Sequence, residues 1–207
     1  MKRLMCVLMM AFFVGTVAAQ LNKVEARQVA KVTDSLGMFT DGRDGKRYKT
    51  VVIGGKRWMA ENLDYEKGNS WCYKNDNFNC GKYGRLYDWK TAKTVCPAGF
   101  HLPSRQEWNN LVAAAGGISA AGKKLKARGG WNNNGNGTDE YGFSALSGGS
   151  RGSDGGFYYA GDYGIWWTAT EYNGVYAYYR VMSYNNGYVG ENYNNKSFGR
   201  SVRCVED

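Results

Sequence analysis

The sequence predicts an α+β fold in which two helices pack on a twisted, mainly antiparallel sheet with long surface loops. Apolar residues recur at helical spacing in segments 87–94 and 104–115. A hairpin pattern covers residues 48–63, and strand patterns rich in Tyr and Trp begin at residue 157. These three observations define the predicted class.

The first helix carries Tyr87, Trp89 and Ala92 on one stripe, and it ends at Cys96 and Pro97 because proline cannot continue a helix. The second helix begins at Ser104. Its hydroxyl can accept from the backbone of Glu107 while Glu107 reaches back, which is a capping box. The glycines at 116 and 117 end this helix. Its expected buried face consists of Trp108, Leu111 and Val112.

The strands flank these helices. Turn residues at 41–46 precede a strand over 48–53, and Gly54 and Gly55 suit a hairpin turn from which 56–63 returns. Segment 64–83 is expected to be a polar loop, and 125–153 is rich in loop-forming glycine and asparagine. The candidate strand positions after residue 157 are Trp166, Trp167, Val175, Tyr179 and Val181.

Residues 1–19 have the pattern of a secretory signal peptide, with Lys2 and Arg3, an apolar stretch and small residues up to Ala19. The apolar stretch is too short to span a bilayer. We therefore expect a secreted or cell-surface protein without a transmembrane span after cleavage. Residues 20–40 form a lead-in with helical spacing over 21–36, and residues 41–207 form one domain.

The net charge does not indicate nucleic acid. It is +9 for the chain and +7 once Lys2 and Arg3 are removed with the signal peptide. Lys and Arg are spread along the chain without a dense basic run, so a solvated basic surface is the favoured interpretation.

Five segments carry a family resemblance in their order: DGKRYKTVVIGGKRWMAENL, LYDWKTAKTVCPAGFHLPSRQEW, GTDEYGFSALSGG, WWTATE and SFGRSVRCV. From residue 41 onward the chain resembles the Fibrobacter succinogenes major paralogous domain, a bacterial family with little defined biochemistry. FHLPSRQEW and GRSVRC are also similar to the formylglycine-generating sulfatase-modifying enzymes. The resemblance implies a C-type-lectin-like fold, and it predicts fold better than function.

Four cysteines follow the signal peptide, namely Cys72, Cys80, Cys96 and Cys204. An even number in an exported protein favours disulfides, and four cysteines allow three pairings. The family pattern implies Cys72 with Cys80 and Cys96 with Cys204. A zinc site is the alternative, but the spacing does not suit a zinc knuckle and the chain has one histidine.

The resemblance also allows a test for catalysis. The sulfatase-modifying enzymes bind copper through two C-terminal cysteines, and the iron-dependent sulfoxide synthases of the same fold use three histidines. Here Cys204 is the one cysteine in that region, and His101 is the one histidine. We expect His101 to bond the backbone and stabilise the turn between the helices. The sequence predicts no catalytic residues, no cofactor and no enzyme.

Calcium is considered for one loop because hard cations prefer oxygen ligands. The loop holds Asn132, Asn133, Asn134, Asn136, Asp139 and Glu140. Alternatively, these residues only satisfy turn geometry. The sequence leaves both interpretations open.

The segment 171–196 interleaves tyrosine with asparagine, which is typical of recognition loops and suits carbohydrate. Strand alternation predicts that Tyr176, Tyr178 and Arg180 are exposed on one face. The opposite face would carry Val175, Ala177, Tyr179 and Val181. The predicted ligand-binding residues are Tyr172, Tyr176, Tyr178, Arg180, Tyr184, Asn186, Tyr188, Asn192 and Tyr193. The alternative is that the tyrosines form ordinary cross-strand pairs without a ligand.

The sequence therefore predicts a secreted or surface-associated, non-catalytic binding protein. Its expected partner is an extracellular glycan or a cell-surface protein, recognised through the Tyr- and Asn-rich segment. Two alternatives remain: a structural envelope module that contacts other proteins, and a metal-dependent oxidase of the sulfatase-modifying type.

Overall fold

The computed structural model describes residues 37–207. The predicted signal peptide (1–19) and the helical lead-in (21–36) lie outside the described residues. The chain divides into two compact units, Met1–Thr40 and Asp41–Asp207. The described part of the first unit contains strand β1 (Met38–Thr40). The paragraphs below concern the second unit.

One sheet joins the two ends of the second unit. Its strand order is β2-β3-β13-β6, and its pairs are antiparallel. Its strands are β2 (Arg47–Ile53), β3 (Lys56–Met59), β13 (Val205–Glu206) and β6 (Phe100–His101). The predicted hairpin is confirmed, with Gly54 and Gly55 at φ 62° and 78°, which glycine adopts without steric cost.

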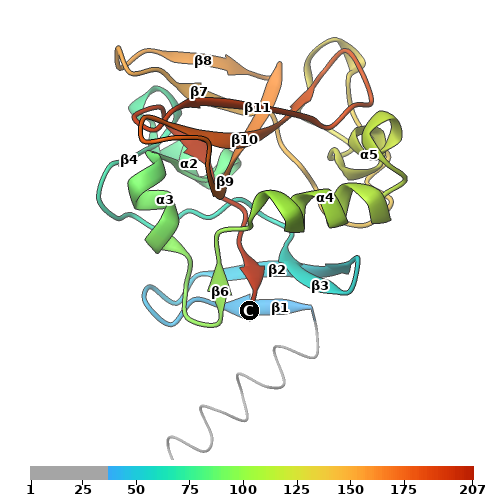
Figure 1. The fold of residues 1–207 in the computed structure, drawn as a ribbon, viewed down its shortest axis with the longest axis horizontal. Helices are drawn as coiled ribbons and strands as arrows, with labels where there is room; N and C mark the ends of the chain where they lie inside the picture. The colour runs from blue at the N-terminus through green and yellow to red at the C-terminus, as the bar shows by residue number, and fades with distance from the viewer. Residues whose placement is uncertain (1–36) are drawn as a thin grey trace, which may run out of the picture. The chain divides into compact units, whose positions relative to one another are not determined.

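A second sheet has the order β11-β10-β9-β12-β5-β4 (Figure 1). All its pairs are antiparallel except that of β12 with β9. Its strands are β11 (Gly190–Asn195), β10 (Tyr176–Ser183), β9 (Tyr163–Glu171), β12 (Arg200–Ser201), β5 (Leu86–Tyr87) and β4 (Ser70–Trp71). Strands β7 (Gly148–Arg151) and β8 (Phe157–Ala160) form a separate hairpin. The predicted positions of Trp166, Trp167, Tyr179 and Val181 in strands are confirmed, whereas Val175 lies just before β10 and is exposed.

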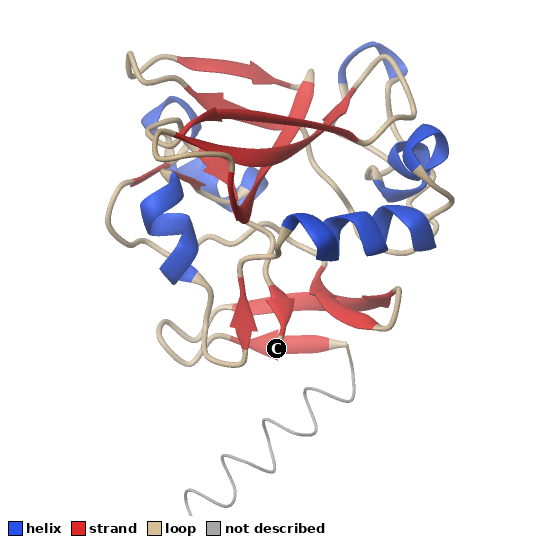
Figure 2. Cartoon of the chain, in the orientation of Figure 1, coloured by secondary structure: helices blue, strands red, loops and turns tan. Residues whose placement is uncertain are grey.

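Both predicted helices are present, as α3 (Trp89–Val95) and α4 (Arg105–Ala114). The described residues also contain α2 (Asn77–Tyr83), α5 (Ile118–Leu125) and the 3-10 turns η1 (Tyr73–Asn75) and η2 (Asn132–Asn134) (Figure 2). The prediction of two helices, and of a loop over 64–83, was therefore incomplete. Helix α2 is short and contains a glycine, so its local signal is weak, but Asp76 caps its first turn through Phe78 N.

The predicted capping box of α4 is confirmed. Ser104 Oγ accepts from Glu107 N (3.2 Å), and Glu107 Oε2 accepts from Ser104 N (2.8 Å). Burial opposes ionisation of Glu107, but its hydrogen bonds from Ser104 and His101 outweigh burial and lower its pKa. The cap therefore places a charged carboxylate at the positive end of the helix dipole.

The core lies between the two sheets, and α4 supplies its centre. Trp108 of α4 contacts Trp58 of β3 with ring centroids 5.3 Å apart, and Trp166 of β9 at 6.1 Å. Phe143 closes the same cluster, and all four rings are at most 1% exposed. The expectation that α4 buries Trp108, Leu111 and Val112 is confirmed.

A buried guanidinium lies beside this core. Arg203 is 0% exposed and donates to Asn62 Oδ1 from Nη2 (2.8 Å) and Nε (3.1 Å), and to the carbonyl oxygens of Phe143 (2.5 Å) and Met59 (3.3 Å). Burial lowers its pKa to about 9, so it stays protonated at neutral pH. Asn62 also accepts from the Trp166 indole (2.8 Å) and therefore links the cation to the tryptophan core.

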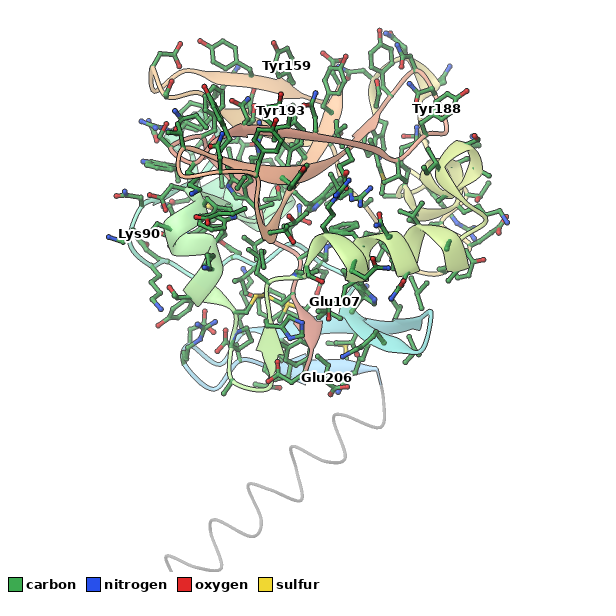
Figure 3. All side chains as sticks on the ribbon, in the orientation of Figure 1. Lys90, Glu107, Tyr159, Tyr188, Tyr193 and Glu206 are labelled. Carbon is green, nitrogen blue, oxygen red and sulfur yellow. A yellow bond between two sulfur atoms is a disulfide. The ribbon has the colours of Figure 1, made fainter. Side chains whose placement is uncertain are left out.

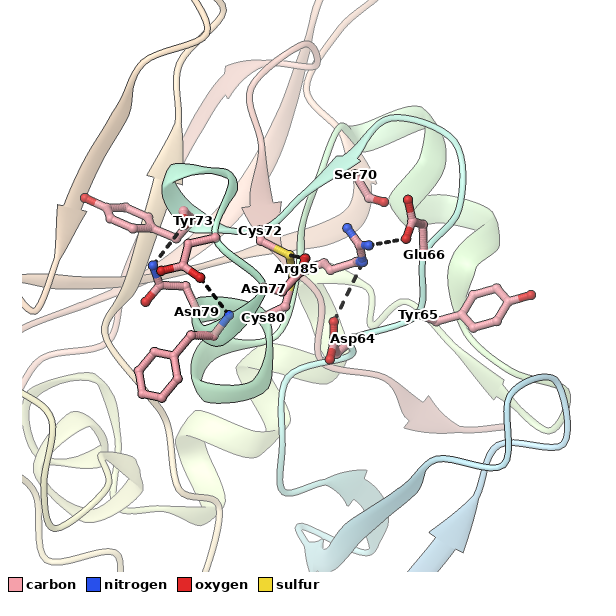
Figure 4. The surroundings of a disulfide bond; sticks show 12 residues. Asp64, Tyr65, Glu66, Ser70, Cys72, Tyr73, Asn77, Asn79, Cys80 and Arg85 are labelled. Atoms are coloured by element: carbon pink, nitrogen blue, oxygen red, sulfur yellow. Dashed lines mark hydrogen bonds and ion pairs between the residues drawn. A yellow bond between two sulfur atoms is a disulfide. The ribbon is translucent and has the colours of Figure 1, made fainter.

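Both predicted disulfides are present. Cys96, at the end of α3, bonds Cys204 just before β13, and Cys72 bonds Cys80 of α2. Figure 4 shows Arg85 beside the second bridge, paired with Asp64 and Glu66. Within residues 37–207, no helix combines the length and the apolar character needed to cross a membrane.

Candidate binding surface

Strands β10 and β11 extend past helix α4, and this extension creates the candidate surface. Under α4, Arg180 of β10 pairs with Glu191 of β11 (2.5 Å) and donates to Arg105 O (3.3 Å) and to Asn109 Oδ1. Beyond the first residue of α4, the helix no longer covers this face. Cross-strand partners share a face, so Tyr178 and its partner Tyr193 lie on the uncovered part.

Four tyrosines form one cluster there, which we call the tyrosine cluster: Tyr172, Tyr176, Tyr178 and Tyr193. The rings of Tyr172 and Tyr193 are stacked with centroids 3.8 Å apart, and Tyr178 meets both edge-on at 5.5 and 6.2 Å. Tyr172, Tyr176 and Tyr193 are 46%, 37% and 43% exposed. The cluster therefore presents a continuous aromatic area, and the ring contacts among its members hold the exposed side chains in place.

Charged side chains frame the cluster. Arg105, the first residue of α4, lies over the ring of Tyr178 at 4.6 Å and pairs with Glu191 at 2.6 Å. The hydrogen bond with Glu191 and its negative charge raise the pKa of Arg105. The hydrogen bond with Tyr172 raises the pKa of Tyr193. The Tyr193 hydroxyl therefore stays protonated at neutral pH and can both donate and accept a hydrogen bond.

The turn that carries Tyr172 is held in place. Asn173 Oδ1 accepts from the backbone N–H groups of Val175 and Tyr176, both at 2.9 Å. Lys196 pairs with Glu171 and donates to Gly174 O (3.0 Å). The hydrogen bond from Lys196 lowers the pKa of Glu171. The cluster is therefore pre-organised, which reduces the entropic cost of binding.

The predicted exposure of Arg180 is wrong. Its side chain is 3% exposed, and burial lowers its pKa although Glu191 opposes the shift. The alternation places Arg180 on the same face as Tyr176 and Tyr178, but α4 covers that part of the face. Arg180 therefore supports the cluster through Glu191 and offers no contact surface.

The remaining predicted site residues lie away from the cluster. Asn192 pairs with Tyr179 in the ladder, so it faces the opposite side from Tyr193. Tyr184 is half-buried and packs against the core. Asn186 and Tyr188 line a shallow depression of about 280 Å³ near the ends of β10 and β11. The structure thus places four of the nine predicted residues in the cluster and the other five elsewhere.

His101 has a different partner from the one predicted. Its ring nitrogens contact carboxylates, with Nδ1 2.7 Å from Asp207 Oδ1 and Nε2 2.8 Å from Glu107 Oε1. The prediction of a backbone partner is wrong, because β6 brings the ring beside the capping box of α4. The histidine therefore links α4 to the chain segment that follows β13.

In the asparagine-rich loop, several oxygens already accept hydrogen bonds. Asn136 Oδ1 accepts from Trp131 N (3.1 Å), and the Asp139 carboxylate accepts from Ser144 N and Oγ, both at 2.7 Å. Asn133 is in the left-handed region at φ 50°. These contacts favour the turn interpretation of the loop. No group of three or more His, Cys, Asp or Glu side chains suited to a metal occurs in residues 37–207.

Sequence reasoning missed several aromatic residues at this end of the molecule. Tyr158 and Tyr159 of β8 are 41% and 55% exposed, and Tyr163 of β9 contacts Tyr159 at 5.4 Å. The aromatic density of the segment FYYAGDY was the available signal. Arg105 was also missed, because only the tertiary fold brings α4 to Tyr178.

A family model, the Fibrobacter succinogenes major domain, matches residues 51–206. The match covers most of the second unit, so the chain belongs to this family. No match was found among curated proteins or among solved structures.

Proposed function

We propose that this protein is a secreted or cell-surface binding protein that recognises an extracellular glycan through the tyrosine cluster. The observation that carries the proposal is the pre-organised group of four tyrosines at the uncovered end of β10 and β11, of which three are exposed and Tyr178 is half-buried. Tyrosine offers a flat apolar face and a polar tip, which match the two kinds of surface on a sugar.

The cell location and the fold enter as parts of this proposal. Two disulfides are typical of exported proteins, and the N-terminal sequence has the pattern of a signal peptide. The C-type-lectin-like fold is supported by the motif resemblance and by the α+β arrangement. The fold alone specifies no ligand, so the argument for glycan binding depends on the cluster.

The charges around the cluster favour an uncharged ligand. Arg105 and Arg180 both pair with Glu191, and Lys196 pairs with Glu171. Each of these three cations thus already has an ion-pair partner within the protein, and the two arginines that share Glu191 leave one net positive charge. Sugar hydroxyls would pair with the tyrosine hydroxyls, and the sugar rings would stack on the exposed ring faces.

A protein partner is the second candidate, because β11 is the edge strand of its sheet. An edge strand presents unpaired backbone groups to which another chain can add a strand. This candidate corresponds to a structural envelope module. The oxidase alternative requires a pair of cysteine thiolates, whereas Cys96 and Cys204 are bonded to each other.

The test compares variants for binding to immobilised neutral polysaccharides and to isolated cell-envelope material. Tyr172→Ala and Tyr193→Ala should each weaken binding at least tenfold, about 1.4 kcal/mol. Phe78→Ala is the matched control, because Phe78 is an exposed aromatic residue of α2, outside the cluster. Unchanged binding by both tyrosine variants, with a melting temperature equal to wild type, would reject the site.

A further inference from the structure

The opposite side of the same sheet carries a second aromatic surface, which we call the hairpin surface. It is formed by Tyr158 and Tyr159 of the β7–β8 hairpin, Tyr163 of β9 and Tyr188 before β11. Tyr163 pairs with Ser183, and Val181 pairs with Gly190, so this face is opposite to that of Tyr178 and Tyr193. The hairpin surface is therefore separate from the tyrosine cluster.

Two shallow depressions lie along the hairpin surface. The first, of about 300 Å³, is lined by Tyr158, Tyr159 and Phe198 together with Ser150 and Ser153. The second, of about 280 Å³, is lined by residues that include Tyr163, Tyr188, Asn185 and Asn186. The contact between Tyr159 and Tyr163 (5.4 Å) connects them. Both depressions are thus lined by aromatic rings together with polar groups.

Tyr159 is held in a strained conformation. Its φ is 69°, in the left-handed region that bulky residues rarely adopt, yet its ring is 55% exposed. The opposite strand approaches closely here, because a Cβ at Gly149 would lie 2.3 Å from Tyr158 O. A strained backbone that displays an aromatic ring to solvent is a feature found at functional sites. Glycine would meet the local geometry without strain, so the backbone conformation does not explain the tyrosine.

The charge of the lining restricts the ligand class. Asp154 is the one charged residue that lines the first depression, and its carboxylate accepts from Tyr158 Oη (2.6 Å) and Gly156 N (3.0 Å). The described lining of the second depression has no charged residue. Arg200, which stacks on Tyr179 at 3.8 Å, is 3% exposed and presents no charge at the surface. This lining suits a neutral ligand and disfavours a polyanion.

We propose that the hairpin surface is a second binding site, which takes an extended chain of a neutral polysaccharide across Tyr159. Figure 3 labels Tyr159 and Tyr188 of the hairpin surface and Tyr193 of the tyrosine cluster. Two sites on one domain raise the avidity for a repetitive polymer without any new contact. This site does not depend on the one proposed above.

The test uses the substitution Tyr159→Gly, which removes the ring and also the strain. Binding is measured on cellulose, xylan and mannan, with polygalacturonate and heparin as anionic probes. The expected result is at least a tenfold loss of affinity for a neutral polymer that wild type binds, with an unchanged or higher melting temperature. Phe78→Ala again serves as the control.

Each outcome supports or overturns the hairpin surface as a binding site for a neutral polysaccharide. A weakened Tyr159→Gly variant with an unaffected Tyr193→Ala variant supports the hairpin surface and contradicts the tyrosine cluster. The reverse pattern overturns the hairpin surface and leaves the proposed function in place. Binding by wild type to the anionic probes alone overturns the proposed ligand class. Absence of binding to every probe overturns this proposal as well.

Discussion

The buried amide of Asn62 should be among the most sensitive positions for stability. Its side chain is 5% exposed, and its oxygen accepts from both the Trp166 indole and the Arg203 guanidinium. Its nitrogen donates to Tyr83 O (2.8 Å). One amide therefore satisfies three partners that come from distant parts of the chain.

The substitution Asn62→Leu keeps the approximate volume and removes every one of these hydrogen bonds. It leaves the Trp166 N–H and Tyr83 O without a partner, at about 1–3 kcal/mol each. It also removes an acceptor from a buried cation, which costs more than for a neutral group. We expect a loss of about 4–6 kcal/mol, which corresponds to a melting temperature lower by about 10–20 °C for a domain of this size.

Urea unfolding followed by tryptophan fluorescence measures this loss directly. Asn110→Leu on the exposed face of α4 is the control, with an expected change within about 0.5 kcal/mol. Asn62→Asp should be milder than Asn62→Leu, because it keeps an acceptor for Arg203 and loses the donor to Tyr83 O. A loss below about 1 kcal/mol for Asn62→Leu would show that the assigned hydrogen bonds do not hold the core together.

Two further predictions concern the disulfides and pH. The Cys96–Cys204 bridge joins residues that are 108 positions apart, whereas Cys72–Cys80 joins residues that are 8 positions apart. Replacing the first pair by serine should therefore lower the free energy of unfolding by about 4–5 kcal/mol, and replacing the second pair should lower it by about 2.5 kcal/mol. Equal losses in urea unfolding would contradict this ranking. Burial lowers the pKa of Lys126 from 10.5 to about 8. The unfolded chain therefore holds more protons between these values, and stability should rise with pH in that window. Arg203, whose pKa burial lowers to about 9, adds its own rise above that value. Lys126→Met should therefore remove the rise between about pH 8 and 9 and leave the part above it, and an identical pH profile in both proteins would contradict this prediction.

The sequence predicted the elements whose signals are local. The capping box at Ser104 and Glu107, the glycine turn of the β2–β3 hairpin and the proline after Cys96 each specify a boundary within a few residues, and the structure confirms all three. The disulfide pairing followed from the family resemblance, because four cysteines alone leave three arrangements open.

The errors arose where tertiary contacts override the local pattern. Alternation placed Arg180 beside Tyr178 on one face correctly, but it could not show that α4 covers only part of that face. The segment 64–83 has few helix-forming residues, and α2 forms there beside a disulfide. The strained Tyr159 has no sequence signature, because backbone angles are set by the pairing of β7 with β8.

The most direct test of glycan recognition is isothermal titration calorimetry with a soluble oligosaccharide of the polymer that binds best, using wild type and Tyr193→Ala. The tyrosine cluster predicts a saturable heat for wild type that is reduced to background or shifted at least tenfold in the variant. Superimposable titrations of the two proteins would contradict the assignment.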